Sequence, residues 1–127
     1  MDPLFLTLDQ VLGLHDDQIR LFGGSGGIRD LGLLQSAIGN AQATFSGQFL
    51  QETLFEMAAA YLYGICRNHP FIDGNKRTAA DAALTFLDLN GIEINATEDD
   101  LYDLVLAVAE GRISKAVVAV FFEQRVS

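Results

Sequence analysis

The stretch NKRTAADAALTFLDLNG, from Asn75 to Gly91, decides the fold. Its alanine, leucine and phenylalanine side chains make it apolar on nearly every side of a helix, and its final glycine is a common helix stop. A helix without a broad polar face has to be covered by neighbours, so we expect this one to lie inside a bundle. Its many alanines would let the neighbouring helices approach closely.

Five further helices are predicted by apolar residues that recur at every third or fourth position. The first begins with a capping box, in which Thr7 is followed three residues later by Gln10. Pro70 disfavours helical geometry at His69 and ends the third, while the valines of the sixth would also suit a strand. The predicted helices run over residues 7–22, 30–45, 51–67, 97–111 and 115–124.

Length and composition fit one all-α domain of about six helices that spans residues 1–127. The chain has 127 residues, of which 50% are hydrophobic and 20% charged. A formal net charge of -9 argues against general binding to nucleic acid or anionic membranes. The apolar runs are too short to cross a bilayer, no secretory signal is recognisable, and the single cysteine, Cys66, cannot form an internal disulfide. We therefore expect a cytoplasmic protein.

One short window reverses this acidic character. The segment RNHPFIDGNKR contains the cations Arg67, Lys76 and Arg77 and a single acid, Asp73. A positive island in an acidic chain favours a local binding site for an anion. Arg67 suits two roles equally well, as part of that site or as a solvated cation at a helix end.

The predicted anion site lies where the helix of residues 75–91 begins. The first amides of a helix have no internal partners and carry partial positive charge, so a phosphate fits there. Gly74 would let the backbone approach such a ligand, and Asn75 is either a turn residue or a phosphate contact. Lys76 and Arg77 stand at the end of the helix that disfavours cations, which makes sense if an anion is bound.

Two further groups in the window suit transfer chemistry. His69 could take a proton from a hydroxyl nucleophile, and Asp73 could hold a magnesium ion that bridges phosphates. The alternatives are a histidine that only caps a helix and an aspartate that only serves as the N-cap of the next one. Together the groups favour a site of phosphoryl or nucleotidyl transfer.

The nine residues HPFIDGNKR, from His69 to Arg77, resemble the signature of the Fic/Doc family. The resemblance is closer to the Doc (death-on-curing) branch, which comprises toxins of bacterial type II toxin–antitoxin modules. Residues 27–30, GIRD, match the start of the second helix of that branch, and the length and helical layout also fit. The resemblance thus covers essentially the whole chain.

The resemblance implies specific roles for these residues. His69 would be the general base toward a hydroxyl of a target protein, and Asp73 would hold Mg²⁺. Residues 46–49 would form a flap that aligns a segment of the target by strand addition. The phosphates of ATP would be bound by Gly74, Asn75, Lys76 and Arg77, and Arg77 would be catalytic together with His69 and Asp73.

The transferred group stays open. The commoner Fic pattern has glycine in place of Lys76 and arginine in place of Ala80; within the family, this difference separates AMP transferases from Doc-like kinases that transfer the γ-phosphate. Pro70 and Gly74 are closer to the AMP-transferring branch.

The Doc-like interpretation implies elongation factor Tu as target and a cognate Phd-like antitoxin as partner. A module that binds a partner or nucleotide without turnover is a further alternative.

Other noticeable residues are expected to be structural. His15 falls on the apolar side of the first helix, and Arg29 with Asp30 suits a pairing arginine beside a helix cap. The run from Gly23 to Gly27 lacks the context of a phosphate-binding loop and is predicted to be a connector. Cys66 is expected to be a small buried hydrophobic residue.

Overall fold

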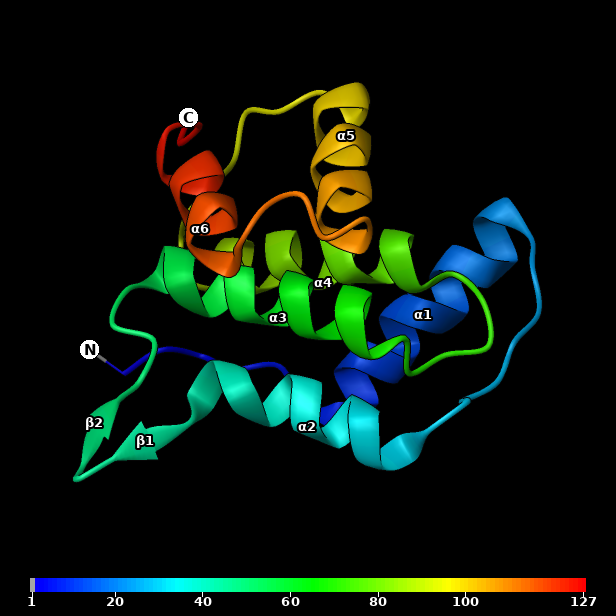
Figure 1. Cartoon of the computed structure of the whole chain (residues 1–127), viewed down its shortest axis with the longest axis horizontal. Helices are drawn as coiled ribbons and strands as arrows, with labels where there is room; N and C mark the ends of the chain where they lie inside the picture. Colours follow the sequence, from blue (N-terminus) through cyan, green and yellow to red (C-terminus); the bar gives the residue numbers. More distant parts are fainter. Residues whose placement is uncertain (1) are drawn as a thin grey trace.

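The centre of the molecule is a pair of neighbouring helices, α3 and α4. In the computed structural model, which describes residues 2–127, nine of the fifteen residues of α3 are buried. Figure 1 shows α2 running along one side of α3, with α5 and α6 standing upright on the other side, while α1 packs against α4. The helices are α1 (Leu8–Phe22), α2 (Leu31–Gln42), α3 (Leu54–Asn68), α4 (Asn75–Leu89), α5 (Glu98–Ala109) and α6 (Lys115–Glu123).

The predicted all-α class is confirmed, including the helical state of the last element. Ser114 caps α6, and its buried residues Val118, Ala119 and Phe122 follow helical spacing. The interior position of α4 is also confirmed, although its Ala80 and Leu84 are only half-buried because they border a pocket. No helix in the described part of the chain has the length and apolarity needed to cross a membrane.

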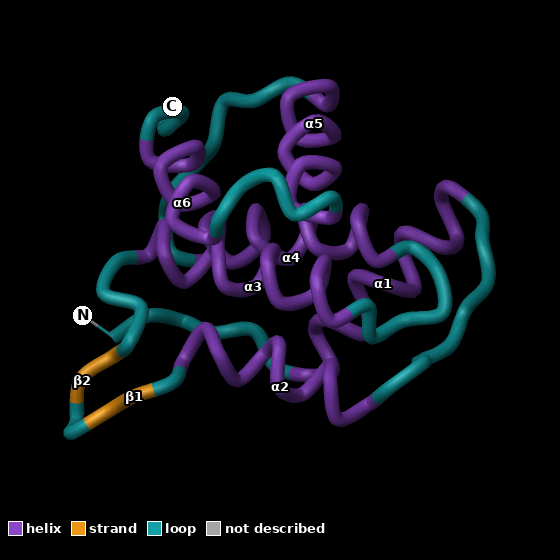
Figure 2. The backbone as a smooth tube through the Cα atoms, viewed as in Figure 1, coloured by secondary structure: helices purple, strands orange, loops and turns teal. Residues whose placement is uncertain are grey.

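The second predicted helix ends three residues earlier than expected. It stops at Gln42, and Phe45 lies in β1 (Thr44–Phe45), which pairs with β2 (Gln48–Phe49) in an antiparallel hairpin (Figure 2). Ser46 and Gly47 both have positive φ, as a tight two-residue hairpin turn requires. Cross-strand pairing therefore overrides the helical periodicity at this point. The Phe45 side chain is 74% exposed.

The third predicted helix starts later than expected. The sequence predicts a start near Gln51, whereas α3 begins at Leu54 because the Thr53 side chain accepts a hydrogen bond from the Glu56 amide. Its C-terminus matches the prediction, since Asn68 is its last residue and Pro70 follows. The first, fourth and fifth helices also lie close to their predicted bounds, and the Thr7–Gln10 capping box is present.

Helices α2 and α3 approach closely at a glycine. A Cβ atom on Gly64 would lie 3.0 Å from the Ala37 Cβ and 3.1 Å from the Ala37 Cα. Main-chain atoms cannot move aside like the end of a flexible side chain, so this contact sets the separation of the two helices.

Replacing Gly64 with valine should therefore destabilise the fold. We expect Gly64→Val to lower the free energy of unfolding by about 1–3 kcal/mol, the usual effect of overpacking. The matched control is Gly39→Val in α2, where a Cβ would meet nothing within 4 Å; there the change should stay within about 0.5 kcal/mol. Urea unfolding followed by circular dichroism measures both, and equal effects would contradict the close-packing argument.

Candidate functional site

The turn between α3 and α4 carries the predicted site and begins with an unusual backbone conformation. His69 has φ 52° and ψ 54°, in the left-handed region, and its N–H donates to the Ile65 carbonyl at 3.2 Å. This geometry ends α3 and turns the chain sharply. Because left-handed geometry is uncommon for a residue with a Cβ, the turn has to be held by its surroundings.

Arg29 and its neighbours hold the first half of the turn. The Arg29 guanidinium donates to the His69 carbonyl at 2.6 Å and to the Asn68 carbonyl at 2.8 Å. These acceptors belong to the C-terminal end of α3, where a cation is electrostatically favoured. The amides of Arg29 and Asp30 both donate to the Pro70 carbonyl, and Asp30 also caps α2. The structural roles predicted for Arg29 and Asp30 are confirmed.

His15 supports the second half of the turn from α1. It is 2% exposed, and its Nε2 lies 2.8 Å from the Asp73 carbonyl. Its ring stacks on that of Phe71 with the ring centres 3.8 Å apart. The predicted structural role is confirmed, but its contact with the site could not be predicted from helical spacing alone.

The Asn75 side chain ties the turn to itself. This residue is 4% exposed; its Oδ1 accepts from the Phe71 N–H at 2.9 Å, and its Nδ2 donates to the Phe71 carbonyl at 2.9 Å. The same Nδ2 lies 3.1 Å from Nδ1 of His69. The carboxamide is thus hydrogen-bonded inside the turn. The main-chain amide of Asn75 is the group left for the anion-binding role expected of a helix N-terminus.

The N-terminus of α4 lacks a side-chain cap. Its N-cap is Gly74, with φ 78° and no capping side chain, whereas each of the other five helices in residues 2–127 has one. The alternative role of Asp73 as the N-cap is therefore wrong. Its carboxylate accepts instead from the Ser25 amide at 3.2 Å and the Gly74 amide at 2.8 Å. The first amides of α4 are left for another acceptor.

These main-chain donors also change the acidity of Asp73. The Ser25 amide, followed by the Gly74 amide and then the nearby charge of Arg77, lowers the pKa of the Asp73 carboxyl. The segment from Gly23 to Gly27, predicted to be only a connector, therefore contributes to the site. The run of glycines could have indicated this contribution, because a Cβ on Gly24 would collide with the Asp73 carboxylate.

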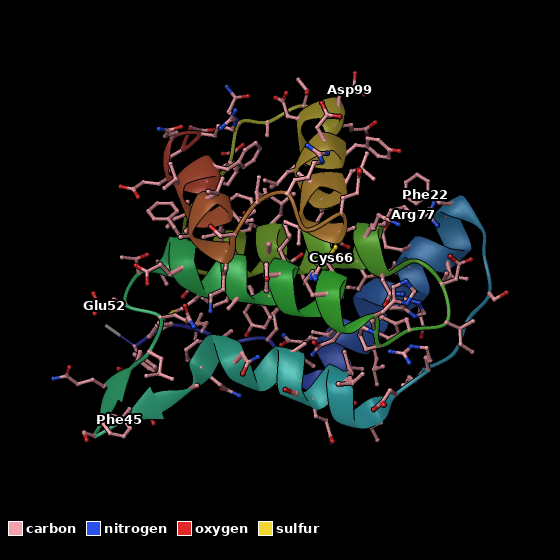
Figure 3. All side chains as sticks on the ribbon, in the orientation of Figure 1. Phe22, Phe45, Glu52, Cys66, Arg77 and Asp99 are labelled. Carbon is pink, nitrogen blue, oxygen red and sulfur yellow. The ribbon has the colours of Figure 1, made fainter. Side chains whose placement is uncertain are left out.

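The two cations of the first turn of α4 are exposed to solvent. Arg77 donates to the Gly23 carbonyl at 3.3 Å, and its guanidinium lies 5.2 Å from the centre of the Phe22 ring (Figure 3). Neither Lys76 nor Arg77 forms a salt bridge with a described residue. Their charges are thus free to act on a bound anion.

A pocket of about 730 Å³ lies above this helix end. It is lined by the predicted site residues His69, Asp73, Gly74, Asn75, Lys76 and Arg77. Its far wall comes from α5, including Asp99 and Tyr102, and sequence reasoning missed this wall. The acidic start of α5 forms a capping box between Thr97 and Asp100.

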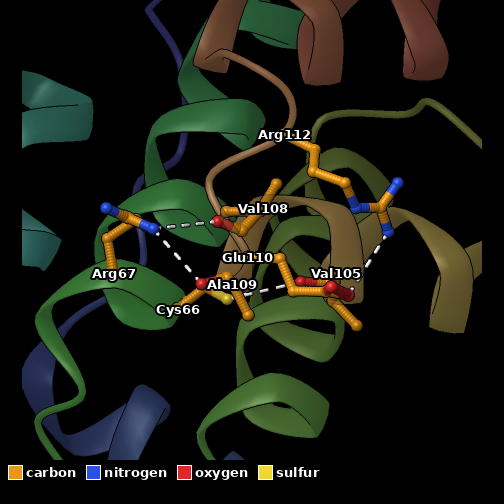
Figure 4. Close-up of polar contacts among 7 residues, drawn as sticks. All are labelled: Cys66, Arg67, Val105, Val108, Ala109, Glu110 and Arg112. Atoms are coloured by element: carbon orange, nitrogen blue, oxygen red, sulfur yellow. Dashed lines mark hydrogen bonds and ion pairs between the residues drawn. The ribbon is translucent and has the colours of Figure 1, made fainter.

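Arg67 lies outside the site. Its guanidinium donates to the Val108 and Ala109 carbonyls at 3.3 and 3.2 Å, at the C-terminal end of α5 (Figure 4). Of its two predicted roles, the helix-end cation is the one present. The neighbouring Cys66 is 6% exposed, and burial raises the pKa of its thiol, which confirms the predicted buried hydrophobic residue.

The chain that carries this turn, uncapped helix end and pocket is also similar in sequence to known proteins. The sequence profile of the Fic/DOC family matches residues 5–87, and the chain belongs to this family. It is 39% identical over 114 residues to "Protein kinase doc" of Escherichia phage P1, covering 90% of this chain and 89% of that protein. It is 47% identical over 78 residues to "Toxin Doc" of Mycolicibacterium smegmatis, covering 61% and 60%.

Removing the hydrogen bond from His15 should loosen the turn. His15→Phe keeps a ring that can stack on Phe71 but leaves the Asp73 carbonyl without its partner. We expect the free energy of unfolding to fall by about 1–2 kcal/mol, the usual effect of leaving a partly buried acceptor unpaired. Chemical denaturation measures this, and an unchanged value would show that the bond contributes nothing to stability.

Asp73 should make stability depend on pH at the acidic end. Because its folded-state pKa lies below the ordinary value of 3.8, the carboxylate stabilises the fold above that pH. This contribution is lost as the pH falls through the folded-state pKa. The stability difference between the wild type and Asp73→Asn should thus be constant near neutrality and shrink below about pH 4. A difference that grows on acidification would contradict the direction of the shift.

Proposed function

We propose that this chain is a toxin of the Doc type that transfers the γ-phosphate of ATP to a hydroxyl group of a target protein. The observation that carries the proposal is the helix end without a side-chain cap, which presents free amides and two unpaired cations beside a histidine. The names of the two relatives, a protein kinase and a toxin, agree with it.

The phosphates would bind at the N-terminus of α4. The amides of Asn75, Lys76 and Arg77 precede the first internal hydrogen bond of the helix, which the Thr78 amide donates to the Gly74 carbonyl. Partial positive charge at this end favours an anion. Arg77 can form two parallel hydrogen bonds to phosphate oxygens, and Lys76 adds a compact charge.

The surroundings of Asp73 fit a magnesium ion. The residue is exposed, its lowered pKa keeps the carboxylate ionised, and each oxygen accepts one main-chain hydrogen bond and keeps a further lone pair. A magnesium ion is commonly held by one or two carboxylates together with phosphate oxygens and water, so Asp73 could be its single protein ligand. When bound, Mg²⁺ would neutralise charge on the phosphates.

The target would meet the site from the side of His69. This side chain is exposed and borders the pocket, so it can reach a hydroxyl that enters there and serve as its general base. The predicted role of residues 46–49 as a flap that aligns the target is wrong, because the hairpin of β1 and β2 lies at the other end of α3 from the turn that carries His69 (Figure 1), and none of residues 44–49 lines the pocket. Elongation factor Tu is the proposed target, and a Phd-like antitoxin would restrain the activity.

Labelled ATP tests the transfer directly. We expect label from the γ position, and none from the α position, to reach elongation factor Tu when the purified protein is incubated with Mg²⁺. His69→Ala should lower the rate by ~10²- to 10⁴-fold, the usual contribution of a positioned base. Arg112→Gln, an exposed change at the far end of α5, is the control that should keep the rate.

Other outcomes would redirect the proposal. Label from the α position would establish AMP transfer in place of phosphate transfer. Transfer to a different protein in a bacterial lysate would replace only the target. Toxicity that survives His69→Ala would favour a module that binds its partner without turnover, and would overturn the enzymatic proposal.

A further inference from the structure

The contact between Asn75 and His69 fixes more than the position of the histidine ring. The Phe71 N–H can only donate a hydrogen bond and the Phe71 carbonyl can only accept one. Both face the Asn75 carboxamide at 2.9 Å, so the main chain itself determines which end of the carboxamide is oxygen and which is nitrogen. The NH₂ group is the end that faces His69.

This orientation decides which ring nitrogen of His69 carries the proton. Nδ1 of the ring lies 3.1 Å from an NH₂ group, which can only donate hydrogen bonds. Nδ1 therefore has to be the acceptor, and a neutral ring carries its proton on Nε2. The reverse arrangement would need the carboxamide to turn over, and its NH₂ group would then face the Phe71 N–H.

We infer that Asn75 is a positioning residue that holds the resting His69 as the tautomer with its proton on Nε2. In this state the ring meets whatever enters the pocket as a hydrogen-bond donor, not as a base. The inference concerns the same residue as the proposed phosphate transfer and deepens that proposal, but the tautomer itself exists whether or not transfer occurs.

The base role then requires a prior change at the Asn75 contact. Nε2 would release its proton to water, Nδ1 would take one from water, and the neutral ring would now offer a bare Nε2. The target hydroxyl could then give its proton to Nε2 while its oxygen bonds to the γ-phosphorus. The bond from that phosphorus to the bridging oxygen breaks, and its electron pair leaves with ADP.

Nitrogen NMR of the ¹⁵N-labelled full chain tests the inference without any activity measurement. Only two histidines are present, and His15 is an internal reference because its Nε2 faces the Asp73 carbonyl and must be a donor. At a pH where both rings are neutral, we expect both to show a protonated, pyrrole-type Nε2 and a bare, pyridine-type Nδ1. A protonated Nδ1 on His69, or two averaged signals, would overturn the inference.

Two variants test whether Asn75 is the cause. Asn75→Asp replaces the NH₂ group by a carboxylate oxygen, so the proton of His69 should move to Nδ1 and the two nitrogen signals should exchange character. Because this change also removes the bond to the Phe71 carbonyl, Asn75→Ala serves as a second variant, in which the two signals should move toward each other. His15 should keep its pattern in both, and an unchanged His69 pattern in both would refute the role of Asn75.

Discussion

A helix N-terminus left without a side-chain cap is the constraint on which the rest of the structure depends. Side-chain caps usually stabilise a helix by about 1 kcal/mol, and five helices of this chain have them. Helix α4 forgoes that contribution, so its N-terminus stays open to a ligand. The turn before it must therefore be held in shape by groups that do not occupy the helix end.

Three side chains from separate parts of the sequence meet this requirement. Arg29 fixes the end of α3, His15 fixes the Asp73 carbonyl, and Asn75 closes the turn on Phe71. None of them covers the first amides of α4. In a chain with a net charge of -9, this helix end with Lys76 and Arg77 is then a local region of positive charge.

Local signals made much of this arrangement predictable from the sequence. Capping residues and apolar spacing indicate the six helices of residues 2–127, and the motif from His69 to Arg77 brings seven of the seventeen pocket-lining residues into one short segment. Contacts that depend on tertiary packing could not be predicted in this way. The stacking of His15 on Phe71 and the α5 wall with Tyr102 arise only when distant elements meet. Arg67 shows the same limit, since its carbonyl partners lie 41 and 42 residues away.

The segment from Gly23 to Gly27 has a consequence for the motions of the site. Four of its five residues are glycines, the residue type with the greatest backbone freedom, yet its one serine supplies an amide to the Asp73 carboxylate. Loop motions typically occur within nanoseconds to microseconds. Each excursion of this segment would withdraw a donor and briefly make the carboxylate more basic. The affinity of Asp73 for the cation proposed there would then be an average over the positions that this loop adopts.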